Sequence, residues 1–345
     1  MTFNIYGIKF IFNNEPLNIN QYFTNEWYSF KDISSNDNAI INVHFTDNIN
    51  IPNDITILSS NIAFSEDSLY LYKTHKLKLN LSEVSTERIK LECSYNIQPV
   101  ELFWLLERIL FVKLIEKGFT PQHASCFEID NKIYAFSSLK ETGKSKILIN
   151  FLENIENIKY ISDDVLILDN NYKALPYPRG MSLHKFHGEI FYKLLKKAEL
   201  KIKARYLIHL VKTKLLKRIE KFTIRLYLHE FIKKIDITTG PISNLYILQK
   251  KKQIDTQKET ISKDEAINFL SENIKMEFFG IFYEEFRLLN FINNPSIKDF
   301  KEYLKRIELK LIANQRNFCN SIDIEKIVLD NNFKPNDIKK ILIDD

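Results

Sequence analysis

One stretch, residues 122–168, constrains the fold of this chain more than any other. An apolar run of β-forming residues, Ile133–Phe136, leads directly into a polar turn that ends in Gly143-Lys144-Ser145. Apolar residues then recur at helical spacing over 147–152, and a second β-type run ends in the pair Asp163-Asp164. The stretch therefore predicts strand, turn, helix and strand in that order, which is typical of the α/β class.

The turn has the form of a phosphate-binding loop with one fixed position altered. Residues 138–145 match G-x-x-x-x-G-K-[ST] except at the first position, where Ser138 replaces glycine. In such loops backbone N–H groups at a helix N-terminus face an anion, the lysine reaches the outer phosphates, and the last hydroxyl contacts Mg²⁺. The residues expected to contact the nucleotide are therefore Ser138, Leu139, Lys140, Glu141, Thr142, Gly143, Lys144 and Ser145.

Composition adds weight to this motif. The chain has only 7 glycines in 345 residues, well below an ordinary usage of about 7%. A glycine retained directly before Lys144 therefore favours a nucleotide site over a chance helix start. The Asp163-Asp164 pair supports the same interpretation, because adjacent carboxylates at a strand end project in different directions. One of them then suits a metal ion and the other a hydroxyl proton.

Together these residues resemble the HPr kinase/phosphorylase superfamily, which shares its nucleotide fold with phosphoenolpyruvate carboxykinase. The resemblance rests on His123-Ala124-Ser125, on the loop ending in Gly143-Lys144-Ser145, and on Ser162-Asp163-Asp164-Val165, which places Asp163 only 19 residues after Lys144. That short gap is a feature of the superfamily. Residues 176–183, with the sequence PYPRGMSL, also resemble the segment that follows the aspartates in the branch that includes lasso-peptide serine kinases.

The resemblance implies a kinase that uses ATP and Mg²⁺ to phosphorylate a hydroxyl group, with serine of a small peptide or protein as the preferred acceptor. It implies that Lys144 binds the β- and γ-phosphates and that Ser145 and Asp163 hold Mg²⁺. It also implies that Asp164 is the base for the acceptor hydroxyl and that His123 lies beside the transferring phosphoryl group. The two aspartates can exchange roles in this scheme, and that choice stays open.

Arg179 is the candidate for substrate binding, because its guanidinium can form a bidentate contact to a phosphate or to an acceptor carboxylate. A surface arginine in a loop is the alternative. The expected partners are a peptide, a protein or a small-molecule hydroxyl acceptor. Nucleic acid is not expected as a partner, and assembly into a homo-oligomer is left open.

The loop departs from the family pattern, and the departure motivates a second hypothesis. Family loops usually carry glycine where this chain has Ser138 and Glu141, and side chains there hinder the approach of backbone to phosphate. The chain is then a nucleotide-sensing or substrate-binding partner with weak catalysis. A third and minor hypothesis, a nucleic-acid binder, rests on the basic amphipathic stretch 196–234, which a solvated helix face also explains.

Length and periodicity predict several domains, because 345 residues exceed a single small core. Short β-prone runs predict a β-rich N-terminal domain over residues 1–97. The nucleotide-binding core is expected over 98–250, and it opens with a buried helix that ends at Gly118. Residues 251–345 are expected to form a helical region, so the fold class is mixed α/β with a phosphoenolpyruvate carboxykinase-like nucleotide domain.

The cysteines and the apolar runs bear on the compartment. The 3 cysteines, Cys93, Cys126 and Cys319, are odd in number and form no C-x-x-C pair. A disulfide framework or a zinc site is therefore not supported, and a reducing cytoplasm is expected. The first residues alternate like a strand rather than a signal peptide, and no apolar run reaches the length of a membrane span, which takes about 18 residues.

Overall fold

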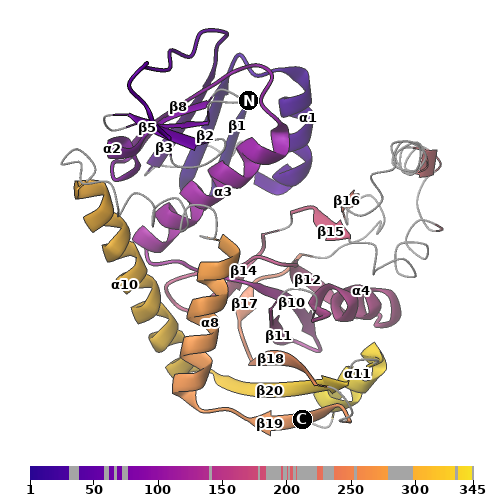
Figure 1. The fold of residues 1–345 in the computed structure, drawn as a ribbon. Coiled ribbons are helices and arrows are strands. Elements are labelled where there is room, and N and C mark those ends of the chain that lie inside the picture. The colour runs from indigo at the N-terminus through magenta and orange to yellow at the C-terminus, as the bar shows by residue number, and fades with distance from the viewer. Residues whose placement is uncertain are drawn as a thin grey trace. The chain divides into compact units, whose positions relative to one another are not determined.

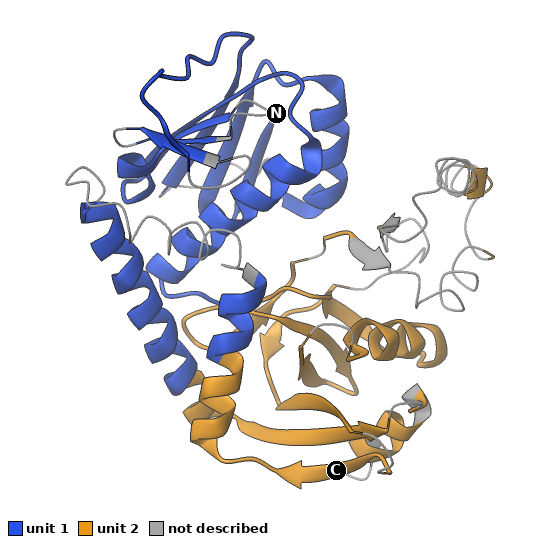
Figure 2. Ribbon diagram, in the orientation of Figure 1, with its two compact units in different colours: residues 1–121, 271–317 blue, residues 122–270, 318–345 orange. Residues whose placement is uncertain are grey.

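The computed structural model describes residues 1–30, 39–57, 62–65, 68–71, 77–139, 142–177, 179–183, 224–227, 237–251, 255–278, 298–330 and 333–343, with a few single residues between 196 and 207. Within these ranges the chain is mixed α/β, with seven α-helices and several β-sheets (Figure 1). It divides into two compact units, residues 1–121 with 271–317 and residues 122–270 with 318–345 (Figure 2).

This division differs from the three consecutive segments expected from the sequence. Residues 98–121 belong to the first unit, whereas residues 122–250 of the expected core and residues 251–270 and 318–345 of the expected helical region belong to the second. The expectation of a helical region over residues 251–345 is wrong over strands β19 (Gln257–Thr260) and β20 (Asp323–Asp330). The run Ile327–Leu329 is fully buried inside a sheet, and an apolar run without alternation does not distinguish such a strand from a helix.

The first unit is built on an eight-stranded sheet in the order β1-β2-β3-β8-β7-β6-β5-β4. Its strands are β1 (Thr2–Ile5), β2 (Ile8–Asn13), β3 (Ala39–Phe45), β4 (Thr56–Ile57), β5 (Ile62–Ser65), β6 (Ser68–Leu71), β7 (Leu77–Asn80) and β8 (Arg88–Cys93). Its helices include α1 (Leu17–Glu26), α2 (Leu81–Val84) and α3 (Pro99–Glu116), with a short 3-10 turn at Tyr28–Phe30. The strands confirm the β-rich expectation, whereas α1 was not predicted.

Helix α3 is buried on nearly all sides, as its sequence predicts, because it packs among aromatic side chains. The ring of Phe103 lies 5.7 Å from that of Phe23 in α1 and 5.5 Å from that of Trp27, the residue directly after α1. Phe3 and Phe10 of the sheet contact the same tryptophan, at 5.4 and 4.7 Å. These contacts support a packing role for the aromatic residues of this unit.

The second unit contains a six-stranded sheet in the order β12-β10-β11-β18-β20-β19. The additional strands are β10 (Ala124–Ile129), β11 (Lys132–Ser137), β12 (Lys159–Ser162), β18 (Asn244–Lys251) and β19 (Gln257–Thr260). A four-stranded sheet joins β9 (Thr120–Gln122), β13 (Leu166–Leu168), β14 (Lys173–Leu175) and β17 (Gly240–Pro241), and a pair joins β15 (Met181–Leu183) to β16 (Ile224–Leu226). Strand β18 runs parallel to both of its neighbours, β11 and β20.

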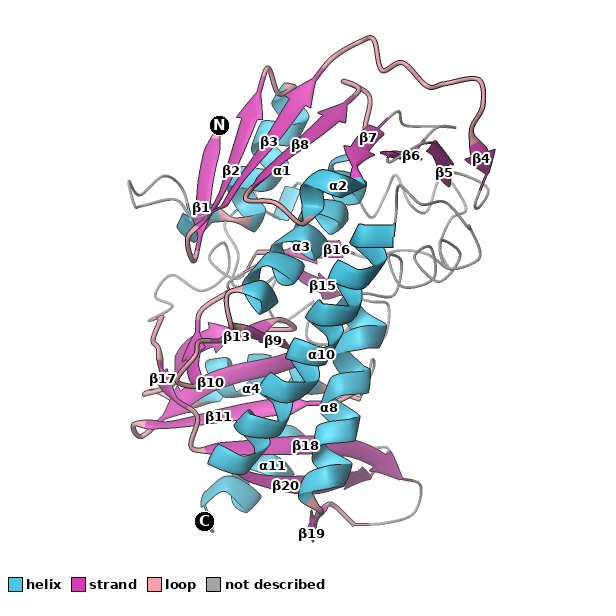
Figure 3. Cartoon of the chain, turned by 90° about the vertical axis from the view of Figure 1, so that its left-hand side faces the viewer, coloured by secondary structure: helices cyan, strands magenta, loops and turns pink. Residues whose placement is uncertain are grey.

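Helices cover both faces of the six-stranded sheet. On one face α4 (Lys144–Asn154) and α11 (Pro335–Ile343) pack on side chains such as Tyr134 and Phe136 of β11. On the other face Ile133 and Ala135 pack against the first turns of α8 (Lys263–Phe278) and the end of α10 (Lys298–Ser321) (Figure 3). This alternation follows from the two-residue period of a strand, and it anchors β11 firmly in the core.

The remaining expectations concern the basic stretch and the membrane. The stretch 196–234 lies mostly outside the described residues. No helix within the described ranges has the length and apolar character needed to cross a membrane.

Candidate active site

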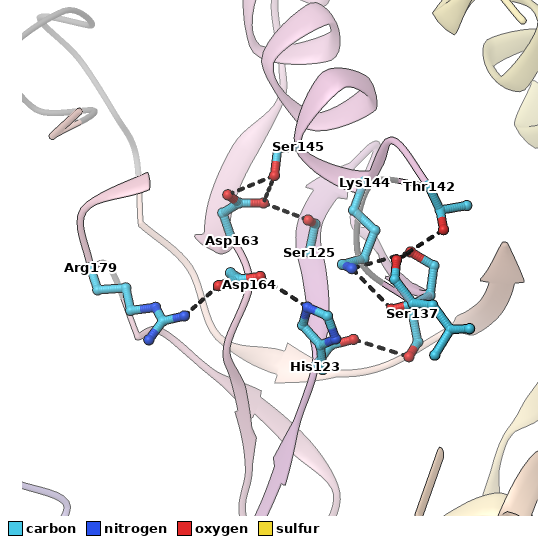
Figure 4. Close-up of polar contacts among 11 residues, drawn as sticks. His123, Ser125, Ser137, Thr142, Lys144, Ser145, Asp163, Asp164 and Arg179 are labelled. Carbon is cyan, nitrogen blue, oxygen red and sulfur yellow. Dashed lines mark hydrogen bonds and ion pairs between the residues drawn. The ribbon is translucent and has the colours of Figure 1, made fainter. Parts of the chain in front are cut away.

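Strand pairing brings the predicted site residues to one edge of the six-stranded sheet. Strand β10 runs antiparallel to both β11 and β12, so β11 and β12 point in the same direction and end at the same edge. The start of β10 lies between those two ends, with Ala124 opposite Ser137 and Cys126 opposite Ser162. The loop after β11, the aspartates after β12 and the residues at the start of β10 therefore converge (Figure 4).

The loop ends at Gly143, whose backbone φ lies in a region that other residues rarely adopt. Gly143 has φ +119° and directly precedes α4, and its carbonyl accepts the first helical hydrogen bond from Ile147 N at 3.0 Å. Thr142 Oγ1 donates to Leu139 O at 2.9 Å and closes the turn. Side chains are strained at such a φ, which explains why glycine is retained here. Lys140 and Glu141 lie outside the described residues.

Lys144 is 6% exposed, and its side chain contacts the first residue of the loop, Ser138. Its Nζ donates to the carbonyl oxygen of Ser138 at 3.0 Å and lies 3.1 Å from the Ser138 hydroxyl. The Lys144 charge also lowers the pKa of both Asp163 and Asp164, so the ammonium lies within electrostatic reach of the aspartate pair. The residue expected to bind phosphates is thus close to the residues expected to hold the metal and the proton.

Asp163 is buried among hydroxyl groups. It is 3% exposed, accepts a hydrogen bond from Ser125 Oγ at 2.6 Å, and lies 3.0 and 3.1 Å from Ser145 Oγ through its two oxygens. Burial and the neighbouring charge of Asp164 raise the pKa of Asp163. The two hydroxyls and the Lys144 ammonium lower that pKa without offsetting the rise. The carboxylate is therefore short of positive charge.

Asp164 has different surroundings. Its side chain is 43% exposed, with Oδ1 3.0 Å from His123 Nε2 and Oδ2 paired with Arg179 Nη2. Burial raises the pKa of Asp164, but the Arg179 guanidinium and the His123 hydrogen bond outweigh that effect and hold the pKa well below its usual range. The backbone of Asp164 has φ +96°, an uncommon conformation for a residue other than glycine. Asp164 is consequently a fixed, charged carboxylate.

The strand ends also fix His123. The His123 side chain is buried, and the backbone carbonyl oxygen of His123 accepts a hydrogen bond from Ser137 Oγ at 3.0 Å. Because Ser137 is the last residue of β11, the histidine is tied to the strand that carries the loop. Figure 4 shows His123 between Asp164 and Lys144.

The donor set suits Mg²⁺ that arrives with a phosphate ligand. The Ser145 hydroxyl and the Asp163 carboxylate are hard oxygen donors, and Mg²⁺ usually takes one or two carboxylates and completes its shell with water and substrate phosphates. No group of three or more His, Cys, Asp or Glu side chains in the described part of the chain could hold a metal by itself. The Ser145 hydroxyl and the Asp163 carboxylate are therefore the residues of this site whose chemistry fits Mg²⁺.

The structure places together His123, Lys144, Ser145, Asp163, Asp164 and Arg179. Two contacts were not predicted. Ser125 donates to Asp163, although its position two residues after His123 on a strand was a usable signal. Arg179 contacts Asp164 rather than standing free for a substrate, and nothing in the local sequence indicates that pairing.

No protein-family model matches the chain, and no curated protein matches it significantly.

Proposed function

We propose that the protein is an ATP- and Mg²⁺-dependent phosphotransferase that moves the γ-phosphoryl group to a hydroxyl, with serine of a small peptide or protein as acceptor. Its nucleotide domain is then of the phosphoenolpyruvate carboxykinase type found in HPr kinase-like enzymes. One observation carries the proposal: a glycine-lysine-serine loop at a helix start lies beside a buried Ser145–Asp163 pair and a His123–Asp164 pair. Phosphoryl transfer needs these three elements and little covalent chemistry from the protein.

In this mechanism the loop holds the triphosphate. The N–H groups at the start of α4 face the phosphates, where the helix dipole favours anions. Lys144 exchanges its contacts with Ser138 for phosphate oxygens, because the β- and γ-phosphates offer the same acceptor chemistry with greater negative charge. Ser138 thus keeps the lysine at the loop until the nucleotide arrives.

Ser145 and Asp163 hold the metal in this scheme. The raised pKa of Asp163 reflects a carboxylate with too little positive charge around it, which a cation supplies. Held by Ser145 and Asp163, Mg²⁺ would supply positive charge against the phosphate oxygens of the nucleotide. Ser125 holds the same carboxylate from the strand side and keeps it oriented.

Asp164 receives the proton of the acceptor hydroxyl. In a loose transition state the hydroxyl loses its proton late, so a weakly basic carboxylate is sufficient. Arg179 occupies one Asp164 oxygen in the free protein. An acceptor that carries a carboxylate or phosphate draws Arg179 away, frees that oxygen and raises the pKa of Asp164. His123 holds the other oxygen and orients the carboxylate.

Nucleotide binding and phosphoryl transfer test the proposal with two variants and one control. Lys144→Ala should weaken binding of ATP with Mg²⁺ by about 100-fold in calorimetry, because it removes a charge-assisted phosphate contact. Asp164→Asn should retain ATP binding and lose transfer of labelled phosphate to serine-containing peptides. Lys159→Ala removes a lysine whose ion pair is with Glu128 and should behave as wild type. Undiminished transfer by either site variant contradicts the assignment.

The second candidate function is a nucleotide sensor with weak catalysis. It is favoured by the engagement of Lys144 with Ser138 and of both Asp164 oxygens with protein groups. Such a sensor binds ATP with Mg²⁺ but shows no sustained turnover with serine, with serine-containing peptides or with sugars. Sustained turnover by the wild-type protein in any of those assays eliminates this alternative.

A further inference from the structure

The turn after β20 lies at the same sheet edge as the phosphate-binding loop. Strands β11, β18 and β20 are parallel, so the residues that follow β11 and β20 leave the sheet on the same side. Phe333, in the turn between β20 and α11, is 4% exposed. A Cβ atom added to Gly143 would meet Phe333 Cζ at 2.8 Å. The ring therefore fills the space beside the glycine on which the loop ends.

The first turn of α4 holds Phe333 in a second way. Lys146 Nζ lies 4.9 Å from the centroid of the Phe333 ring and 3.3 Å from the Phe333 carbonyl oxygen, to which it donates. One side chain thus contacts both the ring face and the backbone of the turn. Backbone hydrogen bonds also hold the residues on either side of the ring, because Phe333 N donates to Asp330 O at 3.1 Å and Lys334 N to Asp337 Oδ2 at 2.9 Å.

We propose that Phe333 is a positioning residue for the phosphate-binding loop. Its ring supports Gly143 in the left-handed conformation and fixes the start of α4, whose N–H groups receive the phosphates. The inference rests on the proposed function. It explains how Gly143 keeps its left-handed conformation at the end of a loop whose first fixed position is serine, because the Phe333 ring fills the space beside the glycine.

Phe333 is also a core residue, in contact with apolar side chains of α4 and α11, so the test must separate position from stability. Phe318→Ala is the matched control, because Phe318 is equally buried but packs on the opposite face of the sheet. Both alanine variants should lower the melting temperature. Only Phe333→Ala should weaken binding of ATP with Mg²⁺, by about tenfold at a temperature where all variants are folded.

Two further variants keep the test decisive if Phe333→Ala does not fold. Phe333→Leu retains apolar bulk beside Gly143 and should keep most of the affinity. Lys146→Met removes the ammonium from the ring while it keeps a flexible apolar side chain, and it should cost about threefold in affinity. If Phe333→Ala folds, an affinity equal to that of Phe318→Ala overturns the proposal; if it does not fold, wild-type affinity in Lys146→Met overturns it.

Hydrogen exchange without nucleotide separates this inference from the proposed function. Phe333→Ala should accelerate exchange of the amides of residues 143–147, whereas Phe318→Ala should leave them at the wild-type rate. If wild-type protein binds no ATP, the proposed function fails, but the exchange rates still decide whether Phe333 positions the loop. Unchanged exchange in Phe333→Ala refutes the positioning role whatever the nucleotide data show.

Discussion

The two sides of the candidate site differ in how their negative charge is balanced. On the buried side Asp163 is surrounded by the hydroxyls of Ser125 and Ser145, and its pKa is raised. On the open side Asp164 is paired with Arg179 and His123, and its pKa is held low. Adjacent residues thus occupy opposite electrostatic surroundings.

This difference bears on a choice that the sequence left open. Titratable neighbours whose surroundings separate their pKa values commonly have different roles. A buried carboxylate short of positive charge is the better cation ligand, whereas one already neutralised by a guanidinium gains less from a metal. The contrast favours Mg²⁺ at Asp163 and the acceptor proton at Asp164, and the following experiments test that order.

The largest expected effect comes from the buried side. Asp163→Asn removes the charge that we propose binds Mg²⁺, so Mg²⁺-dependent transfer should fall by about 10²- to 10³-fold. Stability should move the other way. Because the pKa of Asp163 is raised above 3.8 in the folded chain, its ionisation opposes folding as pH rises through that pKa. Transfer assays and thermal melts at pH 5 and pH 8 measure both effects. A variant that is less stable than wild type, and most so at pH 8, would contradict the electrostatic difference between Asp163 and Asp164.

Gly143→Ala ranks second and affects the loop. The substitution forces a side chain into φ +119° and against Phe333 Cζ at 2.8 Å, so it should cost about 2–3 kcal/mol of unfolding free energy. Gly240→Ala is the control: its added Cβ would meet Ile133 Cδ1 at 2.9 Å, which is the end of a flexible side chain, and no left-handed φ is involved. Equal losses in chemical denaturation would show that the loop glycine has no special conformational role.

Arg179→Gln tests the open side. Without the guanidinium, the pKa of Asp164 should rise toward its ordinary range, because the main opposing charge is gone. The acid limb of the pH–rate profile should shift to higher pH, since Asp164 must be ionised to accept a proton. Arg88→Gln, an exposed change on β8, should leave the profile unchanged. An unshifted acid limb means that Asp164 does not titrate in the reaction.

The same pair should contribute to stability over a limited pH window. A carboxyl group with a depressed pKa stabilises the folded chain above its unfolded pKa and loses that contribution as pH falls through the folded pKa. The Asp164 side chain is 43% exposed, so solvent screening limits the pair to about 0.5 kcal/mol. Arg179→Gln should therefore alter stability slightly at pH 7, and wild type and variant should converge below the folded pKa of Asp164.

Local signals in the sequence predicted the parts of the site that lie within 122–168. The apolar run before the loop, the glycine at its end and the helical spacing after it are properties of neighbouring residues, and β11, α4 and β12 are all present. What could not be predicted depends on strand pairing across the chain. The contact of Phe333 with Gly143 requires β20 to run parallel to β18, but the short, continuous apolar run of β20 does not distinguish a buried strand from a helix.

Ser138 offers the smallest expected effect and the finest test of the loop. Its hydroxyl lies 3.1 Å from Lys144 Nζ, where it competes with an incoming phosphate oxygen for the ammonium. Ser138→Ala removes that competitor and leaves the carbonyl contact, so ATP should bind about two- to threefold more tightly, the worth of one modest hydrogen bond. Ser138→Gly also frees the backbone and should lose part of the gain, because a looser loop must be ordered on binding. Calorimetry on both variants separates the two contributions. Weaker binding by Ser138→Ala would mean that the hydroxyl contacts the nucleotide directly, and that the loop is adapted for turnover rather than degenerate.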